Sequence, residues 1–423
     1  MTKLLIAGTI LVLFCNCGRT SNGPVMSFGG MSGGVGPPSG SGGSVVSVVA
    51  TDPNVLVATV DSGPKNIGYT NGLFVSVTFC VPGTTTCQTI DHLLVDTGSV
   101  GVRVLESELT LALPEANITG GLGIAECTPF VDGTAWGPIK FAEVTLGSET
   151  AANLPIQLIG ENTYTMPSDC TGTAITDFKS LAANGILGVG VYVQDCGTAC
   201  AQPATSRLNP GLYYACSAAS CSVASVPLAQ QVAHPVAAFP VDNNGTIIQL
   251  PSVSASGASS VPGMLVFGIG TQTNNGLGSA TVLALDVQGF VSTTFPVGGK
   301  KYTSYLDSGS NGLFFLNAAT TNLKQCTGGL KDFYCPASTT NLSATLSSTN
   351  GASADIQFSV ANASKLSSQA YAISNLAGPM PGFPLDTSVP GFDWGLPFYY
   401  GRTVYTAIEQ QNTPGGVGPY FAF

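Results

Sequence analysis

Short apolar runs bounded by Gly, Pro, Ser or Asn recur from residue 45 to the C-terminus. The runs at 71–80, 87–95 and 141–146 are rich in Val, Leu, Thr and Phe. These residue types favour extended backbone, and the Gly and Pro residues between them favour tight turns. The pattern therefore predicts an all-β protein.

Two of the predicted strands end in almost the same residues. Positions 93–99 read Leu-Leu-Val-Asp-Thr-Gly-Ser, and positions 304–310 read Ser-Tyr-Leu-Asp-Ser-Gly-Ser. A strand that stops at an aspartate, with glycine two residues later, places a carboxylate on a turn beside open backbone N–H groups. One Asp-x-Gly is ordinary turn chemistry, so the repetition is what carries information.

The repetition continues downstream of each motif. Ile186-Leu187-Gly188 follows the first motif, and Phe-Asp-Trp-Gly-Leu-Pro-Phe at 392–398, with Gly395, follows the second at a nearly equal offset. A constellation repeated at a nearly constant period indicates two copies of one lobe. Two such lobes facing each other bring both aspartates to a shared pseudo-twofold axis.

From Gly72 to Phe423 this pattern resembles the pepsin-like aspartic proteases, which carry Asp-Thr/Ser-Gly once per lobe and apolar-apolar-Gly later in each. The resemblance implies a bilobal β fold with a cleft between the lobes. It implies that Asp96 and Asp307 activate a water that hydrolyses a peptide bond. The positions it implies as support for this pair are Thr97, Gly98, Ser99, Ser308, Gly309 and Ser310, and its structural glycines are Gly188 and Gly395.

The chain departs from this family around the flap, the hairpin that covers the cleft. The flap tyrosine of the family would fall near Asp132, where this chain has none, and Arg103 stands where the family usually has tryptophan. Trp136 is the candidate to cover a substrate instead, or else it packs under its own hairpin. The candidate flap and substrate-binding residues are Gly133, Thr134 and Trp136.

The net charge of the chain indicates which class of partner it binds. The net charge is −10, with 13 Lys and Arg, and charged residues make up 9% of the chain. A chain with so little positive charge is not expected to bind nucleic acid. A peptide or protein substrate is expected instead, and a bilobal protease works as a monomer.

The chain has 12 cysteines and two histidines, His92 and His234. Two histidines and no paired Cys-x-x-Cys spacing predict no metal, and no cofactor is expected. An even number of cysteines beside an export signal indicates an oxidising compartment. The pairs expected from proximity are Cys80–Cys87, Cys127–Cys170, Cys196–Cys221, Cys200–Cys216 and Cys326–Cys335.

The N-terminus reads as an export segment, with Lys3 followed by an apolar run. Lipidation at Cys15 or Cys17 and plain secretion both stay open, so the location is periplasmic, outer-membrane or secreted, with a membrane tether in the lipidated case. The expected division is 1–20 export or lipoprotein signal, 21–44 Gly/Ser/Pro-rich linker, 45–240 first lobe with Asp96, and 241–423 interlobe crossing and second lobe with Asp307.

Three functions compete. The first is an exported bacterial aspartic endopeptidase. The second is an inactive bilobal protein that binds a peptide or other ligand at the cell surface, which the missing flap tyrosine and Arg103 favour. The third, a disulfide-rich β adhesin, requires the twin motifs to be a coincidence. A Ser-His-Asp triad would have to use His92 or His234, and no nucleophile elbow accompanies either.

Overall fold

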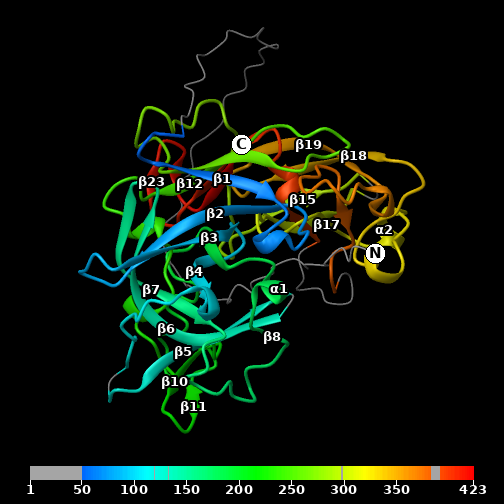
Figure 1. The fold of residues 1–423 in the computed structure, drawn as a ribbon. Helices are drawn as coiled ribbons and strands as arrows, with labels where there is room; N and C mark the ends of the chain where they lie inside the picture. The colour runs from blue at the N-terminus through cyan, green and yellow to red at the C-terminus, as the bar shows by residue number, and fades with distance from the viewer. Residues whose placement is uncertain (1–49, 119, 132, 297–298, 383–390) are drawn as a thin grey trace.

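The computed structural model describes residues 50–118, 120–131, 133–296, 299–382 and 391–423 (Figure 1). Nearly all of its regular structure is β-strand, and its two α-helices, α1 (Phe178–Leu181) and α2 (Ala318–Thr321), have four residues each. The predicted all-β class is therefore confirmed. The expected export segment, the linker and position 132 lie outside the described residues.

One large sheet contains all the described strands between residues 55 and 284, together with two strands near the C-terminus. Strand β8 (Ala174–Ile175) pairs with β6 beside the main path. The main path, in the order of hydrogen bonding, is β11 (Cys221–Val223), β10 (Tyr213–Cys216), β5 (Gly123–Phe130), β6 (Gly133–Leu146), β7 (Glu149–Ile159), β4 (Val100–Leu105), β9 (Gly185–Val189), β3 (Cys87–Asp96), β2 (Gly72–Cys80), β1 (Val55–Asp61), β13 (Val261–Phe267), β12 (Gly245–Leu250), β22 (Arg402–Ala407), β25 (Tyr420–Ala422) and β14 (Val282–Ala284).

A second sheet has seven strands and carries the second motif (Figure 1, yellow to red). A two-stranded sheet, β23 (Asn412–Thr413) with β24 (Gly416–Val417), lies near the C-terminus. The order of the seven-stranded sheet is β19 (Ser353–Val360), β18 (Thr340–Ser347), β15 (Val291–Thr294), β16 (Lys301–Leu306), β21 (Phe392–Trp394), β17 (Leu313–Phe315) and β20 (Ala377–Gly378).

The two motifs occupy the same place in their sheets. Strand β3, which ends at Asp96, runs parallel to β9, and Asp96 lies opposite Gly188. Strand β16 ends one residue before Asp307 and runs parallel to β21 in the same way. All residues of β4, β9 and β21 are buried, as expected for strands covered on both faces. The internal repeat of the sequence is thus a repeat of strand pairing.

The two halves of the chain meet in the joining strands, which are β1, β13, β12, β22 and β25. Strand β1 pairs with β13, β13 with β12, β12 with β22, and β22 with β25, all antiparallel. Strands from the beginning, middle and end of the chain therefore share one ladder of hydrogen bonds (Figure 1). This ladder connects the strands behind Asp96 to the C-terminal strands.

Five disulfides join the cysteines of the described region. Cys80–Cys87, Cys127–Cys170 and Cys326–Cys335 are the expected pairs. The nested pairing expected for the remaining four is wrong, because each bond closes a short local loop. Cys216 and Cys221 lie directly opposite each other in the β10–β11 hairpin, and Cys196 reaches Cys200 in the preceding turn.

The cysteine-rich segment contains two strands, β10 and β11. Strand β10 pairs with β5 and extends the β5–β6 hairpin at its edge. Its residues Tyr213, Tyr214 and Cys216 are buried. Within the described ranges, no helix combines the length and the apolar character needed to cross a membrane.

Candidate active site

The aspartates of the two motifs lie next to each other. A Cβ atom built on Gly309 would lie 2.6 Å from Oδ1 of Asp96 and 3.1 Å from Oδ1 of Asp307, and one built on Gly98 would lie 2.7 Å from Cγ of Asp307. Such approaches are too close for a real side chain, so both turns require glycine. Both aspartates have 0% exposed surface.

The two turns hold their carboxyl groups in the same way. The N–H of Gly98 donates to Oδ1 of Asp96 at 2.8 Å, and the N–H of Gly309 donates to Oδ1 of Asp307 at 2.8 Å. These bonds fix the inner oxygens, which face the other lobe. The outer oxygens accept from serine hydroxyls, Asp96 from Ser99 and Asp307 from Ser310.

Hydrogen bonds also lock the two turns to each other. The N–H of Thr97 donates to Ser308 Oγ at 3.1 Å, and the N–H of Ser308 donates to Thr97 Oγ1 at 2.9 Å. Each hydroxyl then donates to a carbonyl of the opposite motif, Ser308 to Val95 at 2.7 Å and Thr97 to Leu306 at 3.1 Å. Because all four groups are buried, the position of each aspartate depends on the other turn.

Burial determines the charge of the pair. It raises the pKa of Asp96 above its ordinary value. It raises the pKa of Asp307 well above that value, with a further contribution from the charge of Asp96. Two carboxyl groups in contact do not both ionise at low cost, so the pair holds one proton over a wide pH range. One member is then a base while the other is an acid.

Sequence reasoning missed three polar groups beside this pair. Tyr399 contacts Thr97 Oγ1 at 2.9 Å, and since the Thr97 proton goes to Leu306, the Tyr399 hydroxyl is the donor. Asp393 lies 2.6 Å from the Ser310 hydroxyl, and Tyr305 lies beside Asp393. The aspartate was visible in the sequence as a polar residue in the second apolar-apolar-Gly stretch.

Asn71, the residue before β2, links the first half of the chain to the second half. Its side-chain NH₂ donates to the carbonyls of Asn311 at 2.8 Å and Ile373 at 2.9 Å. Its oxygen accepts from the Ile373 N–H at 2.7 Å and from the Tyr400 hydroxyl at 2.9 Å. All hydrogen-bonding atoms of this buried amide are used, so it is a fixed link beneath the site.

The structure places the expected flap residues in a packed hairpin. Trp136 on β6 is 6% exposed, donates to the Tyr164 carbonyl at 2.9 Å and contacts Tyr214 edge-on. Thr134 donates to the Thr171 carbonyl at 2.6 Å, and Gly133 faces the Thr173 carbonyl. Of the two roles considered for Trp136, packing under its own hairpin is the one that these contacts support. The described contacts of these three residues include neither aspartate.

Arg103 is part of a buried ion cluster. Its guanidinium contacts Glu126 at 2.9 Å and Asp195 at 2.7 Å, and it also donates to Gln157 and to the Val100 carbonyl. Burial, together with the negative charge of Glu126, raises the pKa of Asp195 well above its ordinary value. Arg103 thus binds the β5 strand of the hairpin to β4, the strand that follows Asp96.

The two histidines make structural contacts. His92 pairs with Asp61 at 3.4 Å, and this contact raises its pKa. Burial lowers the pKa of His234 to about 4, and its Nδ1 accepts from the Val236 N–H at 3.1 Å. Neither histidine is hydrogen-bonded to a serine among the described residues. In the same part of the chain, no three His, Cys, Asp or Glu side chains gather as metal ligands.

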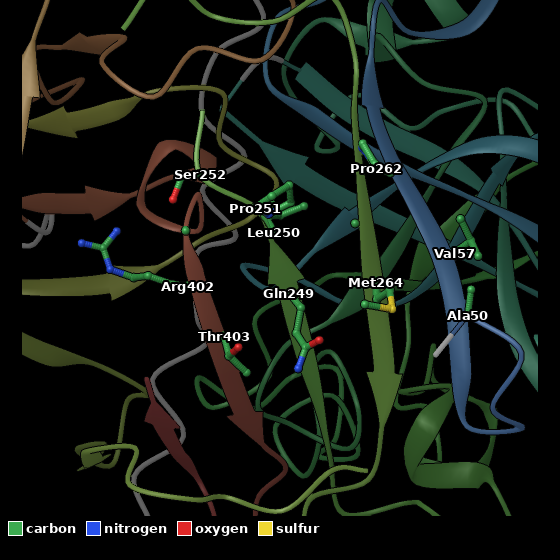
Figure 2. Close-up of a pocket in the computed structure, with 12 residues that line it drawn as sticks. Ala50, Val57, Gln249, Leu250, Pro251, Ser252, Pro262, Met264, Arg402 and Thr403 are labelled. Carbon is green, nitrogen blue, oxygen red and sulfur yellow. The ribbon is translucent and has the colours of Figure 1, made fainter. Parts of the chain in front are cut away.

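A separate depression of about 650 Å³ lies against the joining strands (Figure 2). Its walls come from β1, β12, β13 and the start of β22, and include Gln249, Met264 and Arg402. Neither aspartate lines it. It is therefore distinct from the candidate active site.

A solved structure confirms the likeness of the fold. The chain is similar to the crystal structure of the aspartic proteinase from Irpex lacteus, with a TM-score of 0.51 and 14% identity, over 87% of this chain and 96% of that chain. Identity this low shows the fold alone, so the bilobal pepsin-like fold is confirmed. The search of curated proteins found no match. Over residues 50–423 the chain matches the family described as "Protein of unknown function (DUF3443)", and it belongs to that family.

Proposed function

We propose that this protein is an aspartic endopeptidase that hydrolyses peptide bonds with a water activated between Asp96 and Asp307. The observation that carries the proposal is the complete, symmetric set of hydrogen bonds that brings the two buried carboxyl groups together. A chain that had lost this chemistry would not need both aspartates, both glycines and both cross-linking hydroxyls.

The chemistry follows from the shared proton. The ionised aspartate takes a proton from the water, whose oxygen attacks the peptide carbonyl carbon, while the protonated aspartate donates to the carbonyl oxygen. The resulting tetrahedral diol then breaks its C–N bond. The amine leaves with a proton from the aspartate that received one from water, and the other aspartate recovers its proton from the diol. The pair returns to its starting state with one proton.

Burial of both carboxyl groups bears on this reaction. A low-dielectric site strengthens hydrogen bonds to developing charge. Because Asp96 and Asp307 have no exposed surface, the groups above them must move before a water and a peptide can enter. We therefore expect substrate binding to include an opening step, as covering hairpins provide in other enzymes.

The same burial favours a second candidate, an inactive bilobal protein that binds a peptide. A tightly closed pair and a hairpin whose described side chains pack inward fit a site that retains its structure without turnover. The five disulfides of the described region favour an oxidising compartment for either function, so we further infer that the protein is exported.

One assay separates the two candidates. The full chain is incubated with an unfolded protein from about pH 3 to about pH 7, with and without the inhibitor pepstatin. We expect pepstatin-sensitive cleavage that is lost in Asp96→Asn and Asp307→Asn and retained in Asp355→Asn, an exposed aspartate on β19. Absence of cleavage by a folded wild type, with pepstatin still bound in calorimetry, would establish the binding protein instead.

A further inference from the structure

The hydroxyl of Ser310 lies between two carboxyl groups. Its Oγ is 2.8 Å from Oδ2 of Asp307 and 2.6 Å from Oδ2 of Asp393, and all three residues are buried. A hydroxyl has one proton and can donate to one of these oxygens. The other contact is a hydrogen bond when that carboxyl group itself carries a proton. The geometry therefore requires that either Asp307 or Asp393 is protonated.

The first motif gives an internal reference for this arrangement. Its parallel strand pair places Leu94 opposite Ile186, and both side chains belong to an apolar cluster. The corresponding pair in the second motif is Tyr305 opposite Asp393. Two apolar residues of one lobe are thus replaced by a phenol and a carboxylic acid in the other. Ser99, the counterpart of Ser310, has no such third carboxyl group among its described contacts.

The surroundings of Asp393 favour its neutral form. Strand β21 lies between β16, which presents Tyr305, and β17, which presents Phe314. The apolar side of this region is completed by Leu376 and Met380. Burial raises the pKa of Asp393 well above its ordinary value, although its contacts with Ser310 and Tyr305 act in the opposite direction.

The ionisable groups around Asp393 bring no positive charge. Tyr305 lies on β16 and Asp307 on the turn after it. Asp96 belongs to the first motif, and Tyr399 lies in the segment before β22. Burial raises the pKa of both tyrosines well above its ordinary value, so they stay neutral. The described groups that face Asp393 are therefore neutral or acidic, and none stabilises its carboxylate as a cation would.

We propose that Asp393 is a positioning residue of the aspartate pair: its protonated carboxyl group donates to Ser310 Oγ, and Ser310 donates its own proton to the outer oxygen of Asp307. A hydroxyl that accepts a hydrogen bond becomes a stronger donor. The relay therefore stabilises the ionised form of Asp307 and, with it, the singly charged state of the pair. Its consequence for catalysis rests on the proposed peptidase function, whereas its effect on ionisation does not.

The sign of one measurement tests this assignment. If Asp393 is a neutral donor, replacing it by an apolar residue removes stabilisation of the charged pair, and the first ionisation of the pair moves to higher pH. If Asp393 is instead a carboxylate, the same replacement removes a repelling charge, and the ionisation moves to lower pH. A change that only loosens the packing lets water reach the pair and moves the ionisation to lower pH, so it does not imitate the expected rise.

The experiment is a ¹³C NMR titration of the full chain labelled in its aspartate carboxyl carbons, without substrate. The test variant is Tyr305→Leu with Asp393→Ile, which installs the apolar pair of the first motif. We expect the first ionisation of Asp96 and Asp307 to rise by about one pH unit, the order of a charge-assisted hydrogen bond. Asp393→Asn, whose amide can still donate to Ser310, should leave it near the wild-type value. An unchanged or lowered value in the apolar variant overturns the proposal.

A second measurement does not require the apolar variant to fold. Infrared difference spectra of wild type and Asp393→Asn at neutral pH should show the loss of one protonated carboxyl band. Equal band intensity would show that Asp393 carries no proton, and the proposal fails. If the wild type cleaves no peptide at any pH, the peptidase function fails, while both spectroscopic readouts still decide the role of Asp393. In an active enzyme, the acid limb of the kcat/KM profile should shift upward with the titration.

Discussion

Replacement of Arg103 by methionine should cost far more stability than loss of an ordinary surface ion pair. Arg103 is 1% exposed, and its partners Glu126 and Asp195 are 0% and 6% exposed. Methionine has a similar length but no charge, so it leaves negative charge buried without a cation. Removing one partner of a buried pair costs about 3–5 kcal/mol. We expect that loss in the free energy of unfolding at neutral pH.

The control is Lys65→Met. Lys65 contacts Glu108 at 3.0 Å, nearly the same length as the Arg103–Glu126 contact, but the lysine side chain is 57% exposed. Exposed pairs contribute about 0–1 kcal/mol because water and salt screen them. The two variants therefore compare ionic contacts of similar length in different surroundings.

The assay is urea unfolding of both variants and wild type at about pH 7 and about pH 4. At the lower pH the orphaned carboxylates of Arg103→Met take up protons, so its deficit should shrink. Adding Glu126→Gln and Asp195→Asn to Arg103→Met should restore part of the loss at neutral pH. A deficit no larger than that of Lys65→Met, or one that does not depend on pH, would show that the cluster is not the buried charge balance described above.

Three other predictions follow from the site and its surroundings. Ser308→Ala removes two cross-motif hydrogen bonds and should lower stability by about 1–3 kcal/mol in urea unfolding, whereas Ser256→Ala on an exposed turn should have little effect. Trp136→Phe should reduce stability but leave any kcat/KM close to wild type, because the described contacts of Trp136 lie within its own hairpin and the segments packed on it; a large loss of kcat with unchanged stability would contradict this placement. Stability should fall as pH rises from the ordinary aspartate pKa of 3.8, because the folded state retains protons on its buried carboxyl groups that the unfolded chain has lost; unfolding midpoints that rise over this range would refute it. The carboxyl groups responsible are Asp96, Asp195, Asp307 and Asp393.

The disulfides show which cysteine pairs can be predicted from proximity in the sequence. Cys80 and Cys87 flank a hairpin turn, and a short loop with β-prone flanks leaves few other partners, so the expected pair is present. Among four cysteines close in sequence, proximity favours several pairings equally. The β10–β11 register places Cys216 opposite Cys221, and that register depends on how β10 joins β5.

Asp393 shows what a motif alone leaves open. Its presence two residues before Gly395 is plain in the sequence, but side chains alternate between the faces of a strand. A shift of one residue between β21 and β16 would turn this carboxyl group away from Ser310. The chemical surroundings of Asp393 are therefore a property of strand pairing.

By itself the sequence determined the β class, the two-lobe repeat and the two aspartates, because strand periodicity, turn residues and the Asp-Thr/Ser-Gly motif act over a few neighbouring residues. The tertiary structure alone decided that Trp136 packs inward, that Arg103 meets Glu126 and Asp195, and that Asp393 reaches the pair through Ser310. These outcomes join segments far apart in the chain, and their energies come from burial and from charges that lose contact with water. Neither quantity exists until the lobes have assembled.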